Sequence, residues 1–264
     1  MTEARETSDG TVGRALAVLD LVAEFGRPVR FAEMLPRSGL PKATLYRFLQ
    51  ALSHQDMLAY DAAHQTYAPG MRLVRLAHAA WAQSSLAPLA RDVLDDLAET
   101  LGQTVHLAQL DNGAVLYVDK RNARQPVEMF SHSGKVGPAY CTGVGKAMLA
   151  HLPEDKLSVA LARQSFHAHT PNTLTTPEAL RAELARIRAQ GYALDDEEHE
   201  AGIACIAAPI LSGSGRLMGA LSVTTTTATT SRAHLLVLAG PVIEAAARIA
   251  ATAGTWRFPE PPQT

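Results

Sequence analysis

The chain has 264 residues, of which 47% are hydrophobic and 19% charged, and its formal net charge at pH 7 is −2. This length and balance predict a soluble globular protein with two domains, since a domain usually takes about 100 to 200 residues. They argue against a membrane or secreted protein, because no apolar run reaches ~18 to 20 residues and the N-terminus has no signal-peptide core. We therefore expect a cytoplasmic protein without a membrane partner.

The N-terminal region predicts a tail followed by a helix. Residues 1–10 are polar and are expected to be disordered. An amphipathic helix is predicted from about Val12 to Phe25, because apolar residues recur there at helical spacing and Gly26 and Pro28 follow. Its expected apolar stripe is Val12, Leu16, Leu19 and Val22 or Ala23. This helix would support the helical pair that comes next.

The stretch from Leu35 to Leu52 predicts the turn and second helix of a helix-turn-helix. Ser38 and Gly39 supply a sharp turn, and Pro41 suits the first helical position, where its missing N–H is not needed. The second helix is therefore expected to start at Pro41 or Lys42. Apolar residues at helical spacing define one buried side for each of the two helices. They are Phe31, Met34 and Leu35 before the turn, and Leu45, Phe48, Leu49 and Leu52 after it.

Charge separates this segment from the plain alternative, a helical hairpin with a solvated face. From Gly26 to Gln50 five basic residues accompany one acid, Glu33, so the segment carries a local charge of +4 in a chain of net charge −2. Such a basic island predicts a phosphate-contacting surface on double-stranded DNA. The residues expected to contact DNA are Arg30, Lys42, Ala43, Thr44, Tyr46, Arg47, Gln50 and His64.

The sequence after this helix predicts a wing. Met57–Tyr60 and Gln65–Ala68 are short strand candidates on either side of a turn-like segment. A hairpin here would let His64 or Gln65 touch the DNA backbone or minor groove. We therefore expect a winged helix-turn-helix domain over residues 11–70.

Two helices are expected to follow the wing. Met71–Gln83 has an apolar seam, which predicts a linker helix over residues 71–84 and a dimer contact. Leu86–Leu101 ends at Gly102 and opens the larger domain, which we expect to span residues 85–253. Its expected buried stripe is Leu89, Val93 and Leu97.

The larger domain mixes strands and helices. Thr104–Leu110 and Ala114–Lys120 flank Asn112-Gly113, a strong hairpin signal, so the sheet is at least partly antiparallel. Helices are expected at Thr142–His151, Glu154–Ala162, Pro177–Gln190 and His234–Ala251, and a second hairpin of strands at Ile203–Leu211 and Leu217–Thr227. This pattern predicts an α+β domain, followed by a flexible tail at residues 254–264.

Two glycine-bearing stretches of this domain, Ala139–Lys146 and Asp195–Cys205, lie at element junctions. The first is not a phosphate loop, because Tyr140 and Ala147 stand where a glycine and a Ser or Thr are required. What remains is a helix start whose free N–H groups could hold a carboxylate, or a tight packing turn.

The sequence gives little support for catalysis or metal binding. Cys205, His199 and Asp195 form a possible nucleophilic triad, but they lie close together in sequence, whereas such residues usually converge from separate elements. His167 and His169 lack partners at metal-ligand spacing, and Cys141 lies far from Cys205. We therefore expect no catalytic residue, no metal and no cofactor.

From about Thr11 to Ala251 the chain resembles the IclR-type bacterial transcriptional regulators. The motifs that carry this resemblance stand in the family's order, with the wing between the second and the third: TVGRALAVLDLVAEF, SGLPKATLYRFLQAL, YCTGVGKAMLAHL and DDEEHEAGIACIAAPI. The resemblance implies a winged helix-turn-helix, a linker helix and a C-terminal GAF-like effector-binding domain, assembled as dimers or dimers of dimers.

The resemblance also implies an effector pocket. It would use Gly143 and Val144 at a helix start, Asp195 in an acidic loop, Cys205 on the next strand, and Ser222 and Thr224 on the last strand. Thr142 at the same helix start and the aromatic Tyr140 are added as neighbours. In the family, these positions face small organic acids or aromatics.

Two classes of function are therefore expected. The first is a ligand-responsive repressor or activator of a catabolic operon that senses a small organic or aromatic carboxylate. The alternative is an enzyme or a small-molecule binding protein with an incidental helix-turn-helix. Binding to fragmented genomic DNA would separate the two classes.

Overall fold

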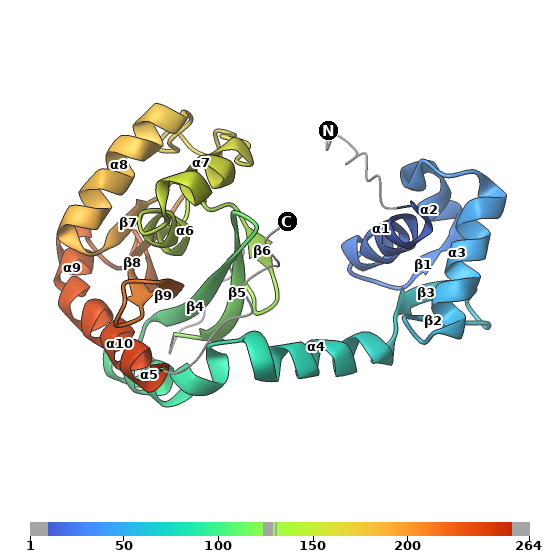
Figure 1. The fold of residues 1–264 in the computed structure, drawn as a ribbon, viewed down its shortest axis with the longest axis horizontal. Helices are drawn as coiled ribbons and strands as arrows, with labels where there is room; N and C mark the ends of the chain where they lie inside the picture. The colour runs from blue at the N-terminus through green and yellow to red at the C-terminus, as the bar shows by residue number, and fades with distance from the viewer. Residues whose placement is uncertain (1–9, 124–128, 130, 255–264) are drawn as a thin grey trace. The chain divides into compact units, whose positions relative to one another are not determined.

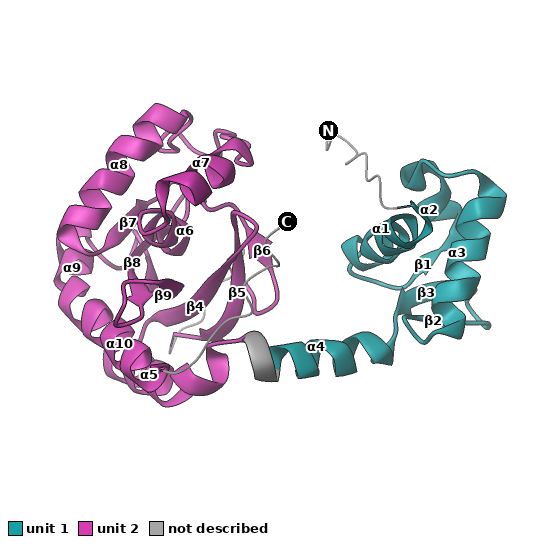
Figure 2. Cartoon of the chain, viewed as in Figure 1, with its two compact units in different colours: residues 1–82 teal, residues 83–264 magenta. Residues whose placement is uncertain are grey.

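A computed structural model describes residues 10–123, 129 and 131–254 of the chain (Figure 1). The chain divides into two compact units, unit 1 at residues 1–82 and unit 2 at residues 83–264 (Figure 2). The expected tails lie outside the described residues, apart from Gly10, which begins the first helix, and Gly254, which ends the described chain.

Unit 1 is the predicted winged helix-turn-helix, which is confirmed. Its three helices pack around one small core, and its three short strands form an antiparallel sheet in the order β1-β3-β2. Strand β1 was not predicted, because two residues are too few to show an alternating pattern. The elements are α1 (Gly10–Glu24), β1 (Val29–Arg30), α2 (Phe31–Ser38), α3 (Lys42–His54), β2 (Leu58–Asp61), β3 (Thr66–Pro69) and the following α4 (Met71–Ser84).

The turn between α2 and α3 follows the local chemistry of its residues. Gly39 has φ 61°, a left-handed conformation that only glycine adopts without strain, and it ends α2. Pro41 is the N-cap residue of α3, and the first helical residue is Lys42. The predicted stripe of α3 is fully buried, namely Leu45, Phe48, Leu49 and Leu52. The opposite face of α3 is thereby left to solvent.

Helix α1 buries only part of its predicted stripe. Its C-terminal half supplies the buried residues, whereas Val12 is 71% exposed and Leu16 is 49% exposed. The expectation for these two residues was wrong, because the core of unit 1 reaches only the second half of the helix. The residues that are buried are Val18, Leu19, Leu21 and Val22.

Unit 2 is an α+β unit, as predicted. A six-stranded sheet in the order β6-β5-β4-β9-β8-β7 pairs every neighbouring strand antiparallel. Helices α5 and α10 cover one face of this sheet, and α6, backed by α7 and α8, covers the other (Figure 1). The elements are α5 (Ala87–Leu101), β4 (Thr104–Asp111), β5 (Ala114–Arg121), β6 (Val136–Gly137), α6 (Gly143–Leu149), α7 (Glu154–Ala162), α8 (Pro177–Gln190), β7 (Ala193–Asp196), β8 (Ile203–Leu211), β9 (Leu217–Thr226), α9 (Arg232–Val237) and α10 (Ala239–Thr252).

Local sequence signals set several of these boundaries. Asn112 and Gly113 have φ of 50° and 86°, the two positive values that a tight two-residue hairpin turn needs. Gly102 and Gly191 end α5 and α8 in the left-handed conformation. In α5, however, Leu89 is only half-buried, and Ala90 and Leu94 are buried in its place. The predicted stripe of α5 was therefore correct only in part.

Three features of unit 2 were not predicted. Strands β6 and β7 were missed, so Asp195 lies on a strand and not in a loop. The single closing helix is divided at Leu238 into α9 and α10. Pro241 explains the division, because it has no N–H and its ring would clash with the carbonyl of Val237 in a continuous helix.

One described stretch, Arg232–Thr252, is long and apolar enough to cross a membrane by length and composition alone. The sequence-based expectation that no run reaches that length missed it. The stretch is nevertheless interrupted at Leu238, and α10 packs on β8 and β9. Val242, Ala245, Ala246 and Ile249 are its buried residues. This is how a core helix of a soluble domain packs.

Helix α6 lies unusually close to the sheet. A Cβ atom on Gly143 would stand 2.5 Å from the sulfur of Cys205, and one on Gly145 would stand 2.4 Å from the carbonyl oxygen of Ala139. Small residues of the facing strands, such as Ala207, leave room for this approach. The N-terminal end of α6 is therefore held directly above β8.

Candidate functional sites

The first candidate site is the outer face of α3 and its surroundings in unit 1. Of the residues predicted to contact DNA on this helix, all are exposed except Thr44, which is half-buried. They are Lys42, Ala43, Tyr46, Arg47 and Gln50. Arg30 is exposed just before α2, and His64 is exposed in the β2–β3 turn. Unit 1 therefore presents the predicted residues to solvent.

A groove runs between α2, the start of α3 and the wing. Four of the predicted residues line it, and they are Arg30, Lys42, Ala43 and Tyr46. Gln65, one of the two wing residues expected to touch DNA, also lines it, whereas Phe31, Ala32, Tyr60 and Tyr67 were not predicted. These aromatic residues had been taken as core or strand residues only. The groove is thus lined by both cationic and aromatic side chains.

Two predicted contact residues have side-chain partners within unit 1. The Nε2 of Gln50 donates to the hydroxyl of Tyr46 at 3.1 Å, one helical turn away. The Nδ1 of His64 lies 2.7 Å from Oδ2 of Asp61, within the wing turn. His64 does not line the groove, whereas its neighbour Gln65 does. Gln65 is thus the better placed of the two wing candidates.

The basic island is narrower than its sequence suggests. Arg27 is paired with Glu33, and Arg37 is paired with Glu24 at 3.0 Å. Within the described part of the chain, Arg30, Lys42 and Arg47 form no ion pair. These three cations remain available for phosphate contacts.

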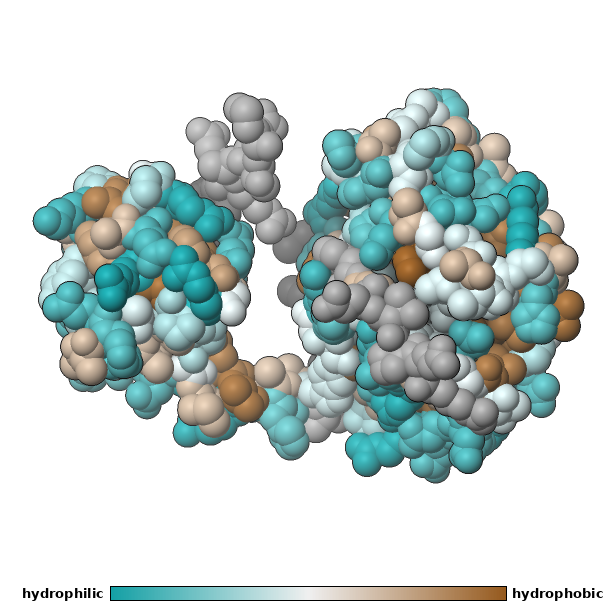
Figure 3. All heavy atoms as spheres, turned by 180° about the vertical axis from the view of Figure 1, so that it is seen from behind, coloured by the Kyte–Doolittle hydropathy of each residue, from teal (hydrophilic) through white to brown (hydrophobic). Residues whose placement is uncertain are grey.

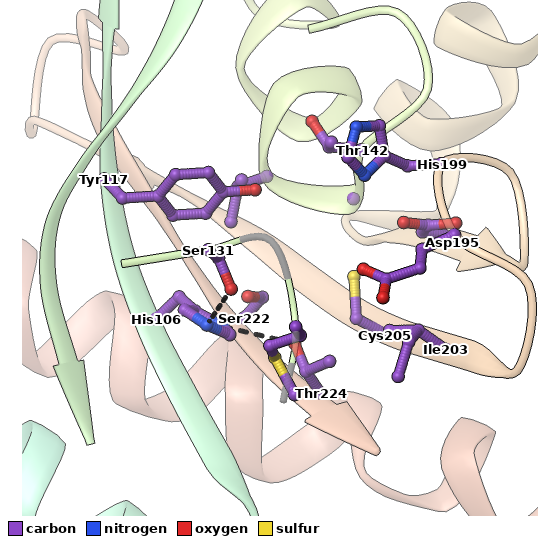
Figure 4. A pocket seen from close by; sticks show the side chains of 14 residues that line it. His106, Tyr117, Ser131, Thr142, Asp195, His199, Ile203, Cys205, Ser222 and Thr224 are labelled. Carbon is purple, nitrogen blue, oxygen red and sulfur yellow. Dashed lines mark hydrogen bonds between the residues drawn. The ribbon is translucent and has the colours of Figure 1, made fainter. Parts of the chain in front are cut away.

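The second candidate site is a cavity in unit 2 between the start of α6 and the sheet (Figure 4). Its unfilled space is about 440 Å³, including the open mouth, and the centre of a water molecule can move within about 40 Å³ of it. The lining residues are His106, Tyr117, Met129, Ser131, Thr142, Gly143, Val144, Asp195, His199, Glu200, Ile203, Cys205, Ser222 and Thr224. A small polar ligand suits a cavity of this size and lining.

The structure brings most of the predicted pocket residues together here. Seven of the eight line the cavity, and they are Thr142, Gly143, Val144, Asp195, Cys205, Ser222 and Thr224. Tyr140 is the exception and does not line it. Its hydroxyl donates to the carbonyl of His167 at 2.7 Å and its ring packs on Phe166 at 5.3 Å, so it belongs to the core beneath α6.

Strand register explains why residues distant in sequence meet here. Asp195 on β7 lies opposite Cys205 on β8, and Cys205 lies opposite Thr224 on β9. Ser222 lies opposite His106 on β4. Directly opposed residues point to the same face of a sheet. All five therefore point to the face that α6 covers.

Half of the lining escaped sequence reasoning. The missed residues are His106, Tyr117, Met129, Ser131, His199, Glu200 and Ile203. A signal existed for His106, because a polar residue in the otherwise apolar run of β4 needs a buried partner. Using it required the pairing of β4 with β9, which the sequence does not reveal.

His106 is a neutral, fully engaged residue of this cavity. Burial, with Lys120 and His132 adding to it, lowers the pKa of His106 to about 3. Its Nε2 lies 2.7 Å from the hydroxyl of Ser131, and its Nδ1 lies 3.2 Å from the hydroxyl of Thr224. A neutral imidazole has one donor and one acceptor, so the ring links the two hydroxyls in a defined direction.

Asp195 stands across the cavity, beside a buried ion pair. Burial, and next the nearby Glu198, raise the pKa of Asp195 to about 7. Lys146 of α6 is 1% exposed; it forms an ion pair with Glu198 and donates to the carbonyl of Leu194 at 2.6 Å. The backbone N–H of Glu198 in turn donates to Asp195 at 2.8 Å. This network fixes the turn after β7.

The triad weighed from the sequence does meet in this cavity, since Asp195, His199 and Cys205 all line it. Burial, and next the carboxyl of Asp195, raise the pKa of the Cys205 thiol well above its usual value. A protonated thiol is a poor nucleophile. Within the described residues, no group of three or more His, Cys, Asp or Glu side chains is placed to hold a metal ion.

A winged helix-turn-helix unit and a separate unit with a buried polar cavity together define a class, that of DNA-binding transcription regulators. Known families agree with this assignment. Residues 11–62 match the model of the IclR helix-turn-helix domain, and residues 78–251 match that of the bacterial transcriptional regulator IclR C-terminal domain. The chain belongs to the IclR family of bacterial transcriptional regulators.

Individual relatives resemble most of the chain. The transcriptional regulator XynR of Escherichia coli is 33% identical over 85% of this chain and 89% of its own length. The crystal structure of the Thermotoga maritima IclR has a TM-score of 0.73 and 28% identity, covering 92% of this chain and 98% of that one. An IclR homologue of Microbacterium hydrocarbonoxydans, solved in complex with 4-hydroxybenzoate, shares the fold at a TM-score of 0.78 and 23% identity, covering 92% of this chain and 98% of that one.

The raised pKa of Asp195 predicts how stability depends on pH. The stability that its protonated form contributes is fully present below the unfolded pKa, near 3.8, and is lost as pH rises through about 7. Asp195→Asn cannot ionise, so we expect it to be more stable than the wild type at about pH 8 by on the order of 1 kcal/mol, with the difference shrinking toward about pH 5. Urea unfolding over this pH range measures it.

Asp196→Asn is the matched control, because Asp196 pairs with Arg232 and does not line the cavity. It should not gain stability with rising pH. A difference between Asp195→Asn and wild type that stays constant from about pH 5 to pH 8 would contradict the assignment.

Proposed function

We propose that this regulator controls a catabolic operon in the cytoplasm, binding operator DNA through unit 1 and a small organic or aromatic carboxylate through the cavity of unit 2. The observation that carries the proposal is the convergence of seven predicted pocket residues on one buried cavity. The Microbacterium hydrocarbonoxydans homologue was solved in complex with 4-hydroxybenzoate, which supports a ligand of this class.

The cavity offers a carboxylate several donors. Ser222 and Thr224 lie two apart on β9, so their hydroxyls point to one side. Thr142 is the N-cap residue of α6. Its hydroxyl donates to the carbonyl of Pro138 at 2.7 Å and does not accept a hydrogen bond from an N–H of the helix. The first N–H groups of α6 thus lack a side-chain cap, and Val144 lies at the cavity.

The alternative, an enzyme or a pure small-molecule binding protein, has less support. Burial raises the pKa of the Cys205 thiol and keeps it protonated, so this thiol is not an activated nucleophile. The relatives with assigned roles are regulators. We therefore propose that the cavity binds a signal and does not turn it over.

A homodimer, alone or paired into a dimer of dimers, is the proposed assembly. The linker helix α4 exposes several large apolar residues, and Figure 3 shows hydrophobic atoms on its surface. Met71 is 73% exposed, Val74 58% and Leu76 52%. Exposed apolar side chains on a helix are stabilised when they pack against a second copy of the chain.

We expect base-reading and phosphate-contacting residues of α3 to respond differently to substitution. Arg47→Ala should cost about 1 to 3 kcal/mol at its preferred base pair and relax specificity there. Lys42→Ala should weaken binding to all sequences alike and reduce the dependence of affinity on salt. Fluorescence anisotropy on an operator and its single-base variants measures both effects. Equal losses on every sequence for both variants would refute this division of roles.

We expect the chain to be at least dimeric at micromolar concentration and to protect a near-palindromic operator. Half-sites should lie about one helical turn, or a multiple of it, apart. Light scattering gives the mass, and footprinting gives the symmetry. Val74→Glu in the exposed face of α4 should lower the mass, whereas Ser158→Glu on the surface of α7 is a control that should not. A monomeric wild type with one asymmetric footprint would overturn the assembly.

We expect Ser222→Ala to weaken binding of the carboxylate effector by about 10-fold or more, because a hydrogen bond to a charged group is lost. In the wild type the effector should change operator affinity by roughly 5- to 150-fold. A thermal-shift screen of catabolic acids identifies the effector, and operator titrations with and without it follow. Ser212→Ala, in the β8–β9 turn, is the control. An unchanged response in Ser222→Ala would remove this residue from the site.

A further inference from the structure

The hydroxyl of Tyr117 is a donor at the cavity for which the described residues supply no partner. Tyr117 stands on β5 and is 7% exposed, and Figure 4 shows its hydroxyl pointing into the cavity. No hydrogen bond joins that hydroxyl to any residue among those the structure describes. A hydroxyl that opens into a cavity without a protein partner is free to bond a ligand there.

Neighbouring groups keep this hydroxyl protonated and in place. Burial, and next the neighbouring Cys205 and Asp195, raise the pKa of Tyr117 well above its usual value. Its ring packs edge-on against His106, with centroids 5.5 Å apart and an interplanar angle of 63°. Tyr117 therefore presents a rigid neutral donor, which suits an acceptor oxygen such as that of a carboxylate.

The charged residues across the cavity from Tyr117 limit which ligand groups can bind there. Asp195 and Glu200 both line the cavity, whereas the lining contains no lysine or arginine. Two carboxylates at hydrogen-bond distance repel unless one of them holds a proton. Above about pH 7, where Asp195 is ionised, a second carboxylate of a ligand would meet that repulsion beside it. A hydroxyl there can instead donate to the carboxyl oxygen.

Building on the proposed effector site, we propose that Tyr117 determines effector specificity by donating its hydroxyl to the effector's carboxylate, while Asp195 accepts from a hydroxyl elsewhere on the same molecule. The effector is then a small hydroxycarboxylate with a single carboxylate group. Ser222 and Thr224 stand on the donor side with Tyr117, and Thr224 is oriented by its contact with His106. The cavity thus selects its ligand by placing hydrogen-bond donors on one side and an acceptor on the other.

Matched ligand series test this on the full-length wild type, without relying on any variant. One series is 3-hydroxypropionate, propionate and malonate, and the other is 4-hydroxybenzoate, benzoate and terephthalate. In each, the members carry a carboxylate with a hydroxyl, with no second polar group, or with a second carboxylate. Calorimetric titration should show, in at least one series, the hydroxy acid binding about 10-fold or more tightly than both analogues.

Variants then assign the two ends of the ligand. Tyr117→Phe removes one oxygen and should weaken the preferred hydroxy acid about 10-fold or more. Tyr192→Phe, which removes a phenol oxygen that does not line the cavity, should leave the affinity unchanged. Asp195→Asn keeps an acceptor oxygen for the N–H of Glu198. It should reduce the difference in affinity between the hydroxy acid and the dicarboxylate. Thermal melts of each variant without ligand verify folding.

The outcomes separate this inference from the function on which it rests. If acids bind and change operator affinity, but with no preference for a hydroxyl and equally in Tyr117→Phe, the regulator stands and the role of Tyr117 is overturned. If dicarboxylates bind best, the role of Asp195 is overturned in the same way. If no acid of either series binds the wild type or alters its operator affinity, the carboxylate-sensing function and this inference fail together.

Discussion

The close packing of α6 against β8 is the constraint on which the site in unit 2 depends. Gly143 has no side chain, so the helix backbone packs directly against the sulfur of Cys205. From the same helix, Lys146 reaches inward and pairs with Glu198, which fixes the turn beside Asp195. One short helix thus forms a wall of the cavity and also holds in place the acidic turn that forms another.

The sheet contributes the remaining walls by a different physical rule. Antiparallel register brings residues from β4, β5, β7, β8 and β9 to one face, and α6 removes that face from water. Burial then decides protonation: it keeps His106 neutral, Tyr117 protonated and the pKa of Asp195 near 7. The cavity is consequently lined by polar groups and weak acids, with no lysine or arginine. Such a lining selects a ligand by the positions of its hydrogen-bond donors and acceptors more than by its net charge.

Local signals were sufficient for most of unit 1 and for many boundaries of unit 2. The glycine at 39, the stripe of α3 and the Asn112-Gly113 turn each act over a few residues, so their meaning can be read along the chain. The same kind of reasoning failed for β1, β6 and β7. Strands this short are stabilised by their partners and carry little pattern of their own.

The sequence by itself determined the winged helix-turn-helix and the order of the longer elements, and it pointed to seven residues of the cavity, six of them through resemblance. Only the tertiary structure decided that Tyr140 belongs to the core, that Arg27 and Arg37 are neutralised by neighbouring acids, and that His106 and Tyr117 face the cavity. The reason is that helix periodicity and turn chemistry are local, whereas burial, ion pairing and strand register depend on residues far apart in the chain.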